Sequence, residues 1–135
     1  MARIRLMGDD VTVSFALSSA LRSAGHDVDT ARFASEALAL LQQADYDLLI
    51  TDIIVRTDEG VVPDGGLLLI SRLRIPGRKL LRNTDIPIIA ISGAVSHMGL
   101  GHILKTPRDL GANGALAKPI DVPTLLAEVR SHLST

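Results

Sequence analysis

Residues 47–54 read DLLITDII, and this stretch decides the fold. A short run of Leu and Ile between two aspartates predicts a strand that is buried on both faces of a sheet. Asp52 interrupts the run near its carboxyl end, where burying an unpaired carboxylate costs free energy. We therefore expect Asp52 to have a chemical role rather than a purely structural one.

Four more apolar runs are typical of strands, and helical patterns separate them. The expected strands are residues 4–7, 26–32, 47–54, 86–91 and 114–117. The expected helical segments are residues 11–24, 36–44, 67–73, 93–110 and 123–133. Such alternation predicts an α/β fold, a doubly wound five-stranded parallel sheet with helices on both faces.

Local signals predict where several helices begin and end. Gly25 suits the end of the first helix, Ser35 is a good N-cap for the second, and Asp121 can cap the last. Apolar residues of the first helix are spaced roughly as one face. They are Val11, Phe15, Leu17, Ala20 and Leu21.

The composition is that of one soluble domain, residues 1–135. Hydrophobic residues make up 47% of the 135 and charged residues 21%, which fits a single core. A formal net charge of −1 and 2% aromatic residues argue against nucleic-acid binding. The absence of cysteine excludes disulfides and thiolate metal sites. No stretch is apolar over a membrane's width, so a cytoplasmic location and no membrane contact are expected.

Polar residues occur at the ends of four expected strands. They are Asp9 and Asp10, then Asp52, Ser92 and Lys118. Parallel strands end at one edge of the sheet, where α/β folds bind ligands, so these side chains should converge. Clustered carboxylates repel one another, and a divalent cation such as Mg²⁺ removes that repulsion. A carboxylate can also attack phosphorus and form an aspartyl phosphate.

This order of residues resembles the receiver domain of two-component response regulators, over essentially the whole chain from Ile4 to Leu133. The resemblance implies a flavodoxin-like sheet with strand order 2-1-3-4-5. It implies that Asp52 is the phosphoacceptor, Ser92 the conformational-switch hydroxyl and Lys118 the phosphate-binding lysine. The implied contacts to Mg²⁺ are Asp9, Asp10, Asp52 and the backbone carbonyl of Ile54.

The resemblance further implies a phosphoacceptor switch in a phosphorelay, which catalyses only its own phosphorylation and dephosphorylation. The phosphoryl donor would be a histidine kinase or a histidine phosphotransfer protein. We expect a stand-alone domain that signals through a downstream protein partner. A receiver cut from a longer regulator would have the same sequence pattern, and this alternative stays open.

Three features depart from the family pattern. The loop of residues 54–66 is longer than usual and lies beside Asp52, so it could gate access or contact a partner. Ala115 stands three residues before Lys118, where many receivers carry a Tyr or Phe that swings inward on activation. Residues 94–110 are long, Gly-interrupted and apolar, which favours a partner or homodimer contact there.

Two other functions are alternatives to that of a phosphoacceptor. A pseudo-receiver would keep the fold and act as an interaction module without phosphorylation. A Mg²⁺-dependent phosphohydrolase would need a further acid near the nucleophile, but Ile53 and Ile54 follow Asp52. The pair Asp9 and Asp10 has a plain structural alternative, since acids before a helix can simply be its N-cap and first-turn acid. Taken singly, Ser92 would usually be a turn residue and Lys118 a surface lysine.

Overall fold

The computed structural model describes residues 2–8, 10–52, 55–57, 60–62, 69, 70, 73, 85–92, 112–117 and 120–133. For residues 55–57, 60–62, 92 and 117 it describes the backbone alone. Within these ranges no helix is both long and apolar enough to cross a membrane.

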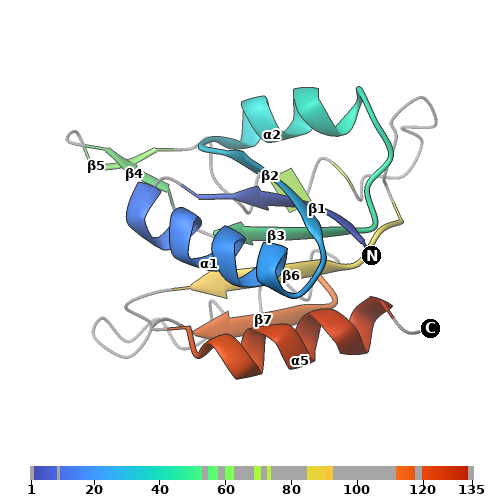
Figure 1. Cartoon of the computed structure of the whole chain (residues 1–135). Helices are drawn as coiled ribbons and strands as arrows, with labels where there is room; N and C mark the ends of the chain where they lie inside the picture. The colour runs from blue at the N-terminus through green and yellow to red at the C-terminus, as the bar shows by residue number, and fades with distance from the viewer. Residues whose placement is uncertain are drawn as a thin grey trace.

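Five parallel strands form the central sheet (Figure 1). They are β1 (Arg3–Met7), β2 (Asp27–Ala31), β3 (Leu48–Asp52), β6 (Ile88–Ser92) and β7 (Gly114–Ala117). Their order is β2-β1-β3-β6-β7. Since β6 and β7 are the fourth and fifth of the expected strands, the predicted order 2-1-3-4-5 is confirmed. In this order the winding reverses between β1 and β3, which places the ligand-binding crevice at their carboxyl ends.

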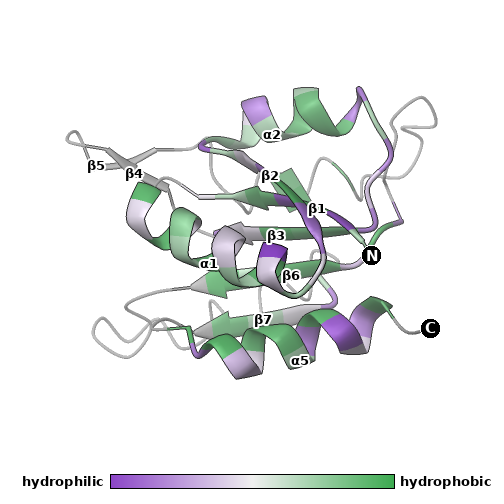
Figure 2. Ribbon diagram, viewed as in Figure 1, coloured by the Kyte–Doolittle hydropathy of each residue, from purple (hydrophilic) through white to green (hydrophobic). Residues whose placement is uncertain are grey.

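Helices cover both faces of the sheet. In Figure 1, α1 (Val11–Ser23) and α5 (Val122–Leu133) lie on one face and α2 (Ala34–Leu41) on the other. Successive residues of β3 point to opposite faces. Leu48 and Ile50 therefore join the core cluster under α1 and α5, whereas Leu49 joins the cluster under α2. The hydropathy colouring in Figure 2 shows apolar strands between helices with mixed surfaces.

The predicted ends of the first and last helices are confirmed. Gly25 has a φ of 97° after α1, a conformation that glycine adopts without strain. The backbone N–H of Gly25 donates to the carbonyl of Arg22, and that of His26 to Leu21, which forms a Schellman motif. At α5, the backbone N–H of Thr124 donates to Oδ2 of Asp121 at 3.0 Å.

Two predictions about helices were wrong. Ser35 is not the N-cap of α2: the helix starts at Ala34, after Phe33, whose side chain makes no capping hydrogen bond. Val11 and Phe15 are 67% and 70% exposed, whereas the buried residues of α1 are Leu17, Ser18 and Leu21. At about 100° per residue, Phe15 and Leu17 lie nearly opposite each other around the helix, so one face could not hold both.

The expected loop of residues 54–66 contains regular structure. Strands β4 (Val55–Thr57) and β5 (Gly60–Val62) pair antiparallel, with Val55 opposite Val62. Of the expected helix at 67–73, Leu69, Ile70 and Leu73 are helical and buried. Residues 94–110, predicted to contact a partner, lie outside the described ranges.

Candidate functional site

Asp52 is the last residue of β3, at the carboxyl edge of the sheet. Its relative exposure is 6%, so the carboxylate is largely withdrawn from solvent. The register places Asp52 opposite Ile91 of β6, and Met7 of β1 opposite Thr51. The hydroxyl of the fully buried Thr51 donates to the carbonyl of Asp52 at 3.0 Å, which fixes the backbone at this strand end.

Gly8 gives the Asp52 carboxylate its space. A Cβ placed on Gly8 would lie 2.6 Å from Oδ2 of Asp52 and 3.4 Å from Oγ of Ser14. The backbone N–H of Gly8 donates to the carbonyl of Ala31 at 2.9 Å, so its position is tied to β2. The carboxylate therefore lies against a bare backbone, and a larger residue at position 8 would displace it.

Asp10 lies at the same edge and caps α1. Its Oδ1 accepts a hydrogen bond from the backbone N–H of Val13 at 3.2 Å, and its carbonyl accepts one from Ser14 at 2.9 Å. The structural alternative for Asp10 is thus realised. Asp10 is exposed, and the cap uses only its Oδ1. Its other carboxylate oxygen, Oδ2, remains at the edge where Asp52 ends β3.

The backbone register brings one further predicted residue, Ser92, to this edge. Ser92 ends β6 one residue beyond the partner of Asp52, and it pairs with Ala117, the residue before Lys118. The side chain of Ser92 and all of Asp9, Ile54 and Lys118 lie outside the described part of the chain. In the part that is described, no three His, Cys, Asp or Glu residues gather as a metal site.

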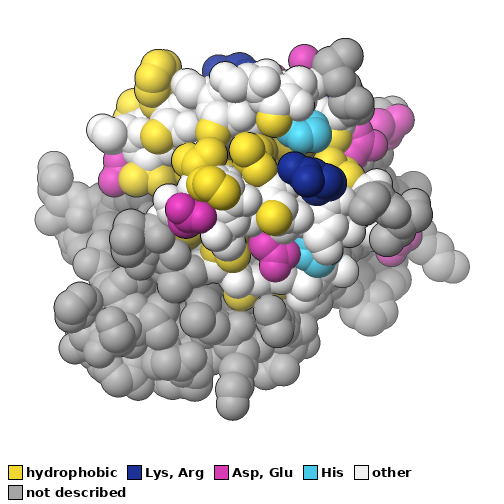
Figure 3. All heavy atoms as spheres, turned by 60° about the horizontal axis from the view of Figure 1, so that its bottom comes forward, with side chains coloured by type: hydrophobic (Ala, Val, Ile, Leu, Met, Phe, Trp, Pro, Cys, Tyr) yellow, Lys and Arg dark blue, Asp and Glu magenta, His cyan; other side chains and the backbone are white. Residues whose placement is uncertain are grey.

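Exposed apolar side chains lie near the first residues of the helices that begin at the same edge of the sheet. Among described residues the large ones are Val11 and Phe15 in the first turns of α1, and Val122, 39% exposed, which begins α5. Both helices begin at the carboxyl edge of the sheet (Figure 1). Figure 3 views the molecule from the α5 side, where hydrophobic side chains reach the surface among charged ones.

A pocket of about 310 Å³ links the apolar side chains of α1 to the Asp52 edge. Gly8 and Ser14 line it together with Val11 and Phe15. Neither Gly8 nor Ser14 was a predicted site residue. The sequence did carry a signal for Gly8, because a glycine between a strand and an acidic pair indicates close approach of another group to the backbone.

Comparisons with known proteins agree with this architecture. Residues 4–130 match the family described as the response regulator receiver domain. The chain is 32% identical over 135 residues to the DNA-binding dual master transcriptional regulator RpaA of Synechocystis, which covers 98% of this chain and 49% of RpaA. It is 31% identical to the transcriptional regulatory protein KdpE of Staphylococcus aureus, over 96% of this chain and 48% of KdpE. The chain thus spans about half the length of these relatives.

Solved structures give the same result. A response regulator from Chloroflexus aurantiacus superposes with a TM-score of 0.79 at 28% identity, covering 99% of this chain and 98% of that one. The chemotaxis response regulator CheY4 of Vibrio cholerae gives 0.78 at 25% identity, covering 98% and 99%. With its strand order, its acidic carboxyl edge and a family match over nearly its full length, the chain belongs to the receiver domain family of two-component response regulators.

Proposed function

We propose that this chain is one receiver domain, residues 1–135, and that Asp52 accepts a phosphoryl group. The observation that carries the proposal is the buried Asp52 carboxylate, which ends β3 at the switch point and lies against Gly8. A carboxylate held there presents a nucleophile at the edge where α/β sheets bind ligands.

The reaction we propose is a transfer from a phosphohistidine. A carboxylate oxygen of Asp52 attacks phosphorus, an acyl–phosphate P–O bond forms, and the P–N bond breaks with its electron pair returning to the imidazole. Ser92, which ends β6 at this edge, and Lys118, which follows Ala117 in the sequence, would contact the phosphoryl oxygens. Water attacking phosphorus would later release inorganic phosphate and restore the carboxylate. The chain would then be a self-modifying regulator and not an enzyme with a free substrate.

Receiver domains generally use Mg²⁺ at the phosphorylation site. The donors at this edge fit that ion, because Asp10 and Asp52 offer hard carboxylate oxygens and the chain has no cysteine to supply a thiolate ligand. Asp9, Asp10, Asp52 and the carbonyl of Ile54 would hold the ion. When bound, Mg²⁺ would neutralise charge on the phosphoryl group.

Receiver domains interact with histidine kinases or phosphotransfer proteins. We propose that the donor contacts the exposed side chains at the starts of α1 and α5, because both helices begin at the edge of the sheet where Asp52 ends β3. Buried apolar anchors commonly dominate the binding energy of such interfaces. Output would follow through contacts with a downstream protein, in the cytoplasm. Transcriptional regulation is named for relatives about twice as long and is not carried over.

Intact mass tests the proposal. After incubation with Mg²⁺ and acetyl phosphate, the wild type should gain one phosphoryl group, and excess EDTA should abolish the gain. Asp52→Asn should gain none. Asp27→Asn is a matched control, because Asp27 is an exposed aspartate at the start of β2, on the opposite edge. A wild type that stays unmodified would instead indicate a pseudo-receiver.

A further inference from the structure

Arg5 is a buried cation in the middle of β1, on the face of the sheet that α2 covers. Its relative exposure is 3%, although its neighbours Ile4 and Leu6 belong to the apolar core of the other face. Arginine is almost never buried in this way without acceptors for its N–H groups. Arg5 has five N–H donors, and each needs an acceptor.

The acceptors found for Arg5 are fewer than its donors. Nη1 donates to the carbonyl of Thr30 at 3.2 Å, and Nη2 donates to the hydroxyl of Tyr46. Nε is buried and has no hydrogen-bond partner among the described residues. Among the described residues, the carboxylate paired with Arg5 is that of Asp29. Its Oδ2 lies 3.9 Å from Nη2, which is beyond hydrogen-bond distance.

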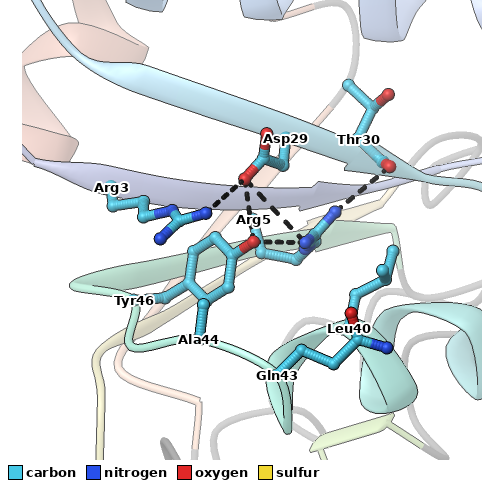
Figure 4. A pocket seen from close by; sticks show the side chains of 8 residues that line it. All are labelled: Arg3, Arg5, Asp29, Thr30, Leu40, Gln43, Ala44 and Tyr46. Carbon is cyan, nitrogen blue, oxygen red and sulfur yellow. Dashed lines mark hydrogen bonds and ion pairs between the residues drawn. The ribbon is translucent and has the colours of Figure 1, made fainter.

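Asp29 is shared among several donors, so it cannot compensate Arg5 alone. Its Oδ2 accepts from the hydroxyl of Tyr46 at 2.8 Å and lies 3.6 Å from Nη2 of Arg3. Two guanidinium groups thus face one carboxylate (Figure 4). Burial, followed by the hydrogen bond to Asp29, raises the pKa of Tyr46, so its hydroxyl stays neutral and adds no negative charge. The ionised side chains that line the adjoining pocket, Arg3, Arg5 and Asp29, sum to one positive charge, and Oδ2 of Asp47 accepts a hydrogen bond from the backbone N–H of Arg3 at 2.8 Å beside it.

A pocket of about 450 Å³ adjoins the cluster. Figure 4 shows the residues that line it, with Tyr46 between Arg3 and Arg5 and with Leu40 and Gln43 on the Arg5 side. The volume is within the range of small-molecule sites. Arg3 lines the pocket with a side chain that is 48% exposed, so its guanidinium group is accessible from solvent.

A purely structural role explains only part of this arrangement. The guanidinium groups of Arg3 and Arg5 lie 4.9 and 4.8 Å from the centre of the Tyr46 ring, so cation–π contacts account for their positions on the ring. These contacts use the faces of the guanidinium groups and leave the N–H donor at Nε unmatched. A structural role also gives no reason for a hollow beside a buried cation.

We propose that this pocket binds a small oxyanion, a phosphate or carboxylate group of a low-molecular-weight ligand, at the pocket-facing edges of Arg3 and Arg5, beside the Tyr46 ring on which both guanidinium groups pack. Planar guanidinium groups bind such oxyanions through paired charge-assisted hydrogen bonds. The pocket lies toward the amino edge of the sheet, because Arg3 begins β1 and Tyr46 precedes β3. It is therefore separate from the Asp52 edge and does not depend on the proposed phosphorylation.

The test follows the arginine Nε–Hε resonances of the ¹⁵N-labelled chain by NMR. The chain is titrated with inorganic phosphate and, separately, with sodium acetate, against sodium chloride at equal ionic strength. EDTA is present throughout so that no Mg²⁺ draws anions to the other edge, and the Asp52→Asn background excludes formation of an acyl phosphate there. We expect a saturable shift of the Arg5 resonance with at least one oxyanion and none with chloride. Phosphate alone, acetate alone, or both would define the ligand group, and each result supports the site.

Three variants decide whether the cluster is the site. Arg3→Gln should weaken the apparent affinity about tenfold or more, because one charge-assisted hydrogen bond is lost. Arg32→Gln is the matched control, since Arg32 is exposed and does not line this pocket, and its affinity should equal that of the parent. Arg5→Met, similar in length and uncharged, should bind no oxyanion. No saturable shift with either anion, or unchanged affinity in Arg3→Gln, would overturn the proposal, even if Arg5→Met failed to fold.

Discussion

Replacing Gly8 with alanine should damage the phosphorylation site while leaving the fold in place. The added Cβ would lie 2.6 Å from Oδ2 of Asp52. The oxygen must move about 0.4 Å to reach 3.0 Å and about 0.8 Å to reach ordinary contact at 3.4 Å. Oγ of Ser14 in α1 lies 3.4 Å from the same Cβ, which is ordinary contact. A shift of α1 alone would therefore not relieve the contact between the Cβ and the Asp52 carboxylate.

The displacement sets the expected magnitudes. Adding a methyl group to a well-packed site costs about 1–3 kcal/mol of unfolding free energy. A reactive group misplaced by about 1 Å commonly loses about 100-fold in rate, so a shift somewhat below that should slow acetyl phosphate labelling about 10- to 100-fold. The loss in labelling rate should thus exceed what a small loss of stability can explain, because the variant stays folded at assay temperature.

The assay is the initial rate of phosphoryl gain by intact mass, with urea unfolding measured in parallel. Gly114→Ala is the matched control, because its Cβ would meet Nε2 of His132 at 3.0 Å, the end of a movable side chain remote from Asp52. We expect it to keep the wild-type rate. Labelling of Gly8→Ala at the wild-type rate would refute the reasoning that Gly8 holds space for the carboxylate.

Other perturbations have separate expected outcomes. Phe15→Ala should leave stability within about 0.5 kcal/mol and labelling by acetyl phosphate unchanged, because the side chain is 70% exposed. Transfer from a phosphohistidine protein donor should nevertheless slow about tenfold, measured as the second-order rate constant. Asp121→Ala should lower Tm at neutral pH by removing the cap of α5. Hydrogen bonds from Thr124, side chain first and then backbone, lower the pKa of Asp121, so the Tm difference should vanish as pH falls through that lowered pKa. Tyr46→Phe should reduce the loss of stability at alkaline pH. Because folding raises the pKa of Tyr46, the wild type loses stability as the pH climbs above 10.0, and urea unfolding of both proteins measures the difference.

Much of the fold could be predicted because the deciding signals are local. DLLITDII marked a buried strand, and all five residues of β3 are buried. Gly25 marked a helix end because few other residues tolerate its φ of 97°. Val11 and Phe15 were misplaced because an apolar residue indicates burial only when a neighbour covers it, and the start of α1 has none among the described residues. The β4–β5 hairpin was missed because strands of three residues are too short to carry a periodic signal.

From the sequence, the candidate site could be predicted only as the set of polar residues at the strand ends, without the contacts between them. Asp52 was placed correctly at the carboxyl edge, since strand order converts sequence position into spatial position. The contact of Gly8 with Asp52 was not predictable, because it depends on how closely β1 and β3 approach at their ends. The Arg5 cluster also escaped prediction: its partners Asp29 and Tyr46 come from separate segments, and only the folded sheet brings them together.

Borohydride trapping tests the central claim most directly. An acyl phosphate is reduced by sodium borohydride to an alcohol, so a phosphorylated aspartate becomes homoserine. After labelling with acetyl phosphate and Mg²⁺, we predict homoserine at position 52 alone when peptides are sequenced by tandem mass spectrometry. Reduction at another aspartate, such as Asp10, or phosphoryl gain without any reducible residue, would contradict the assignment of Asp52 as the phosphoacceptor.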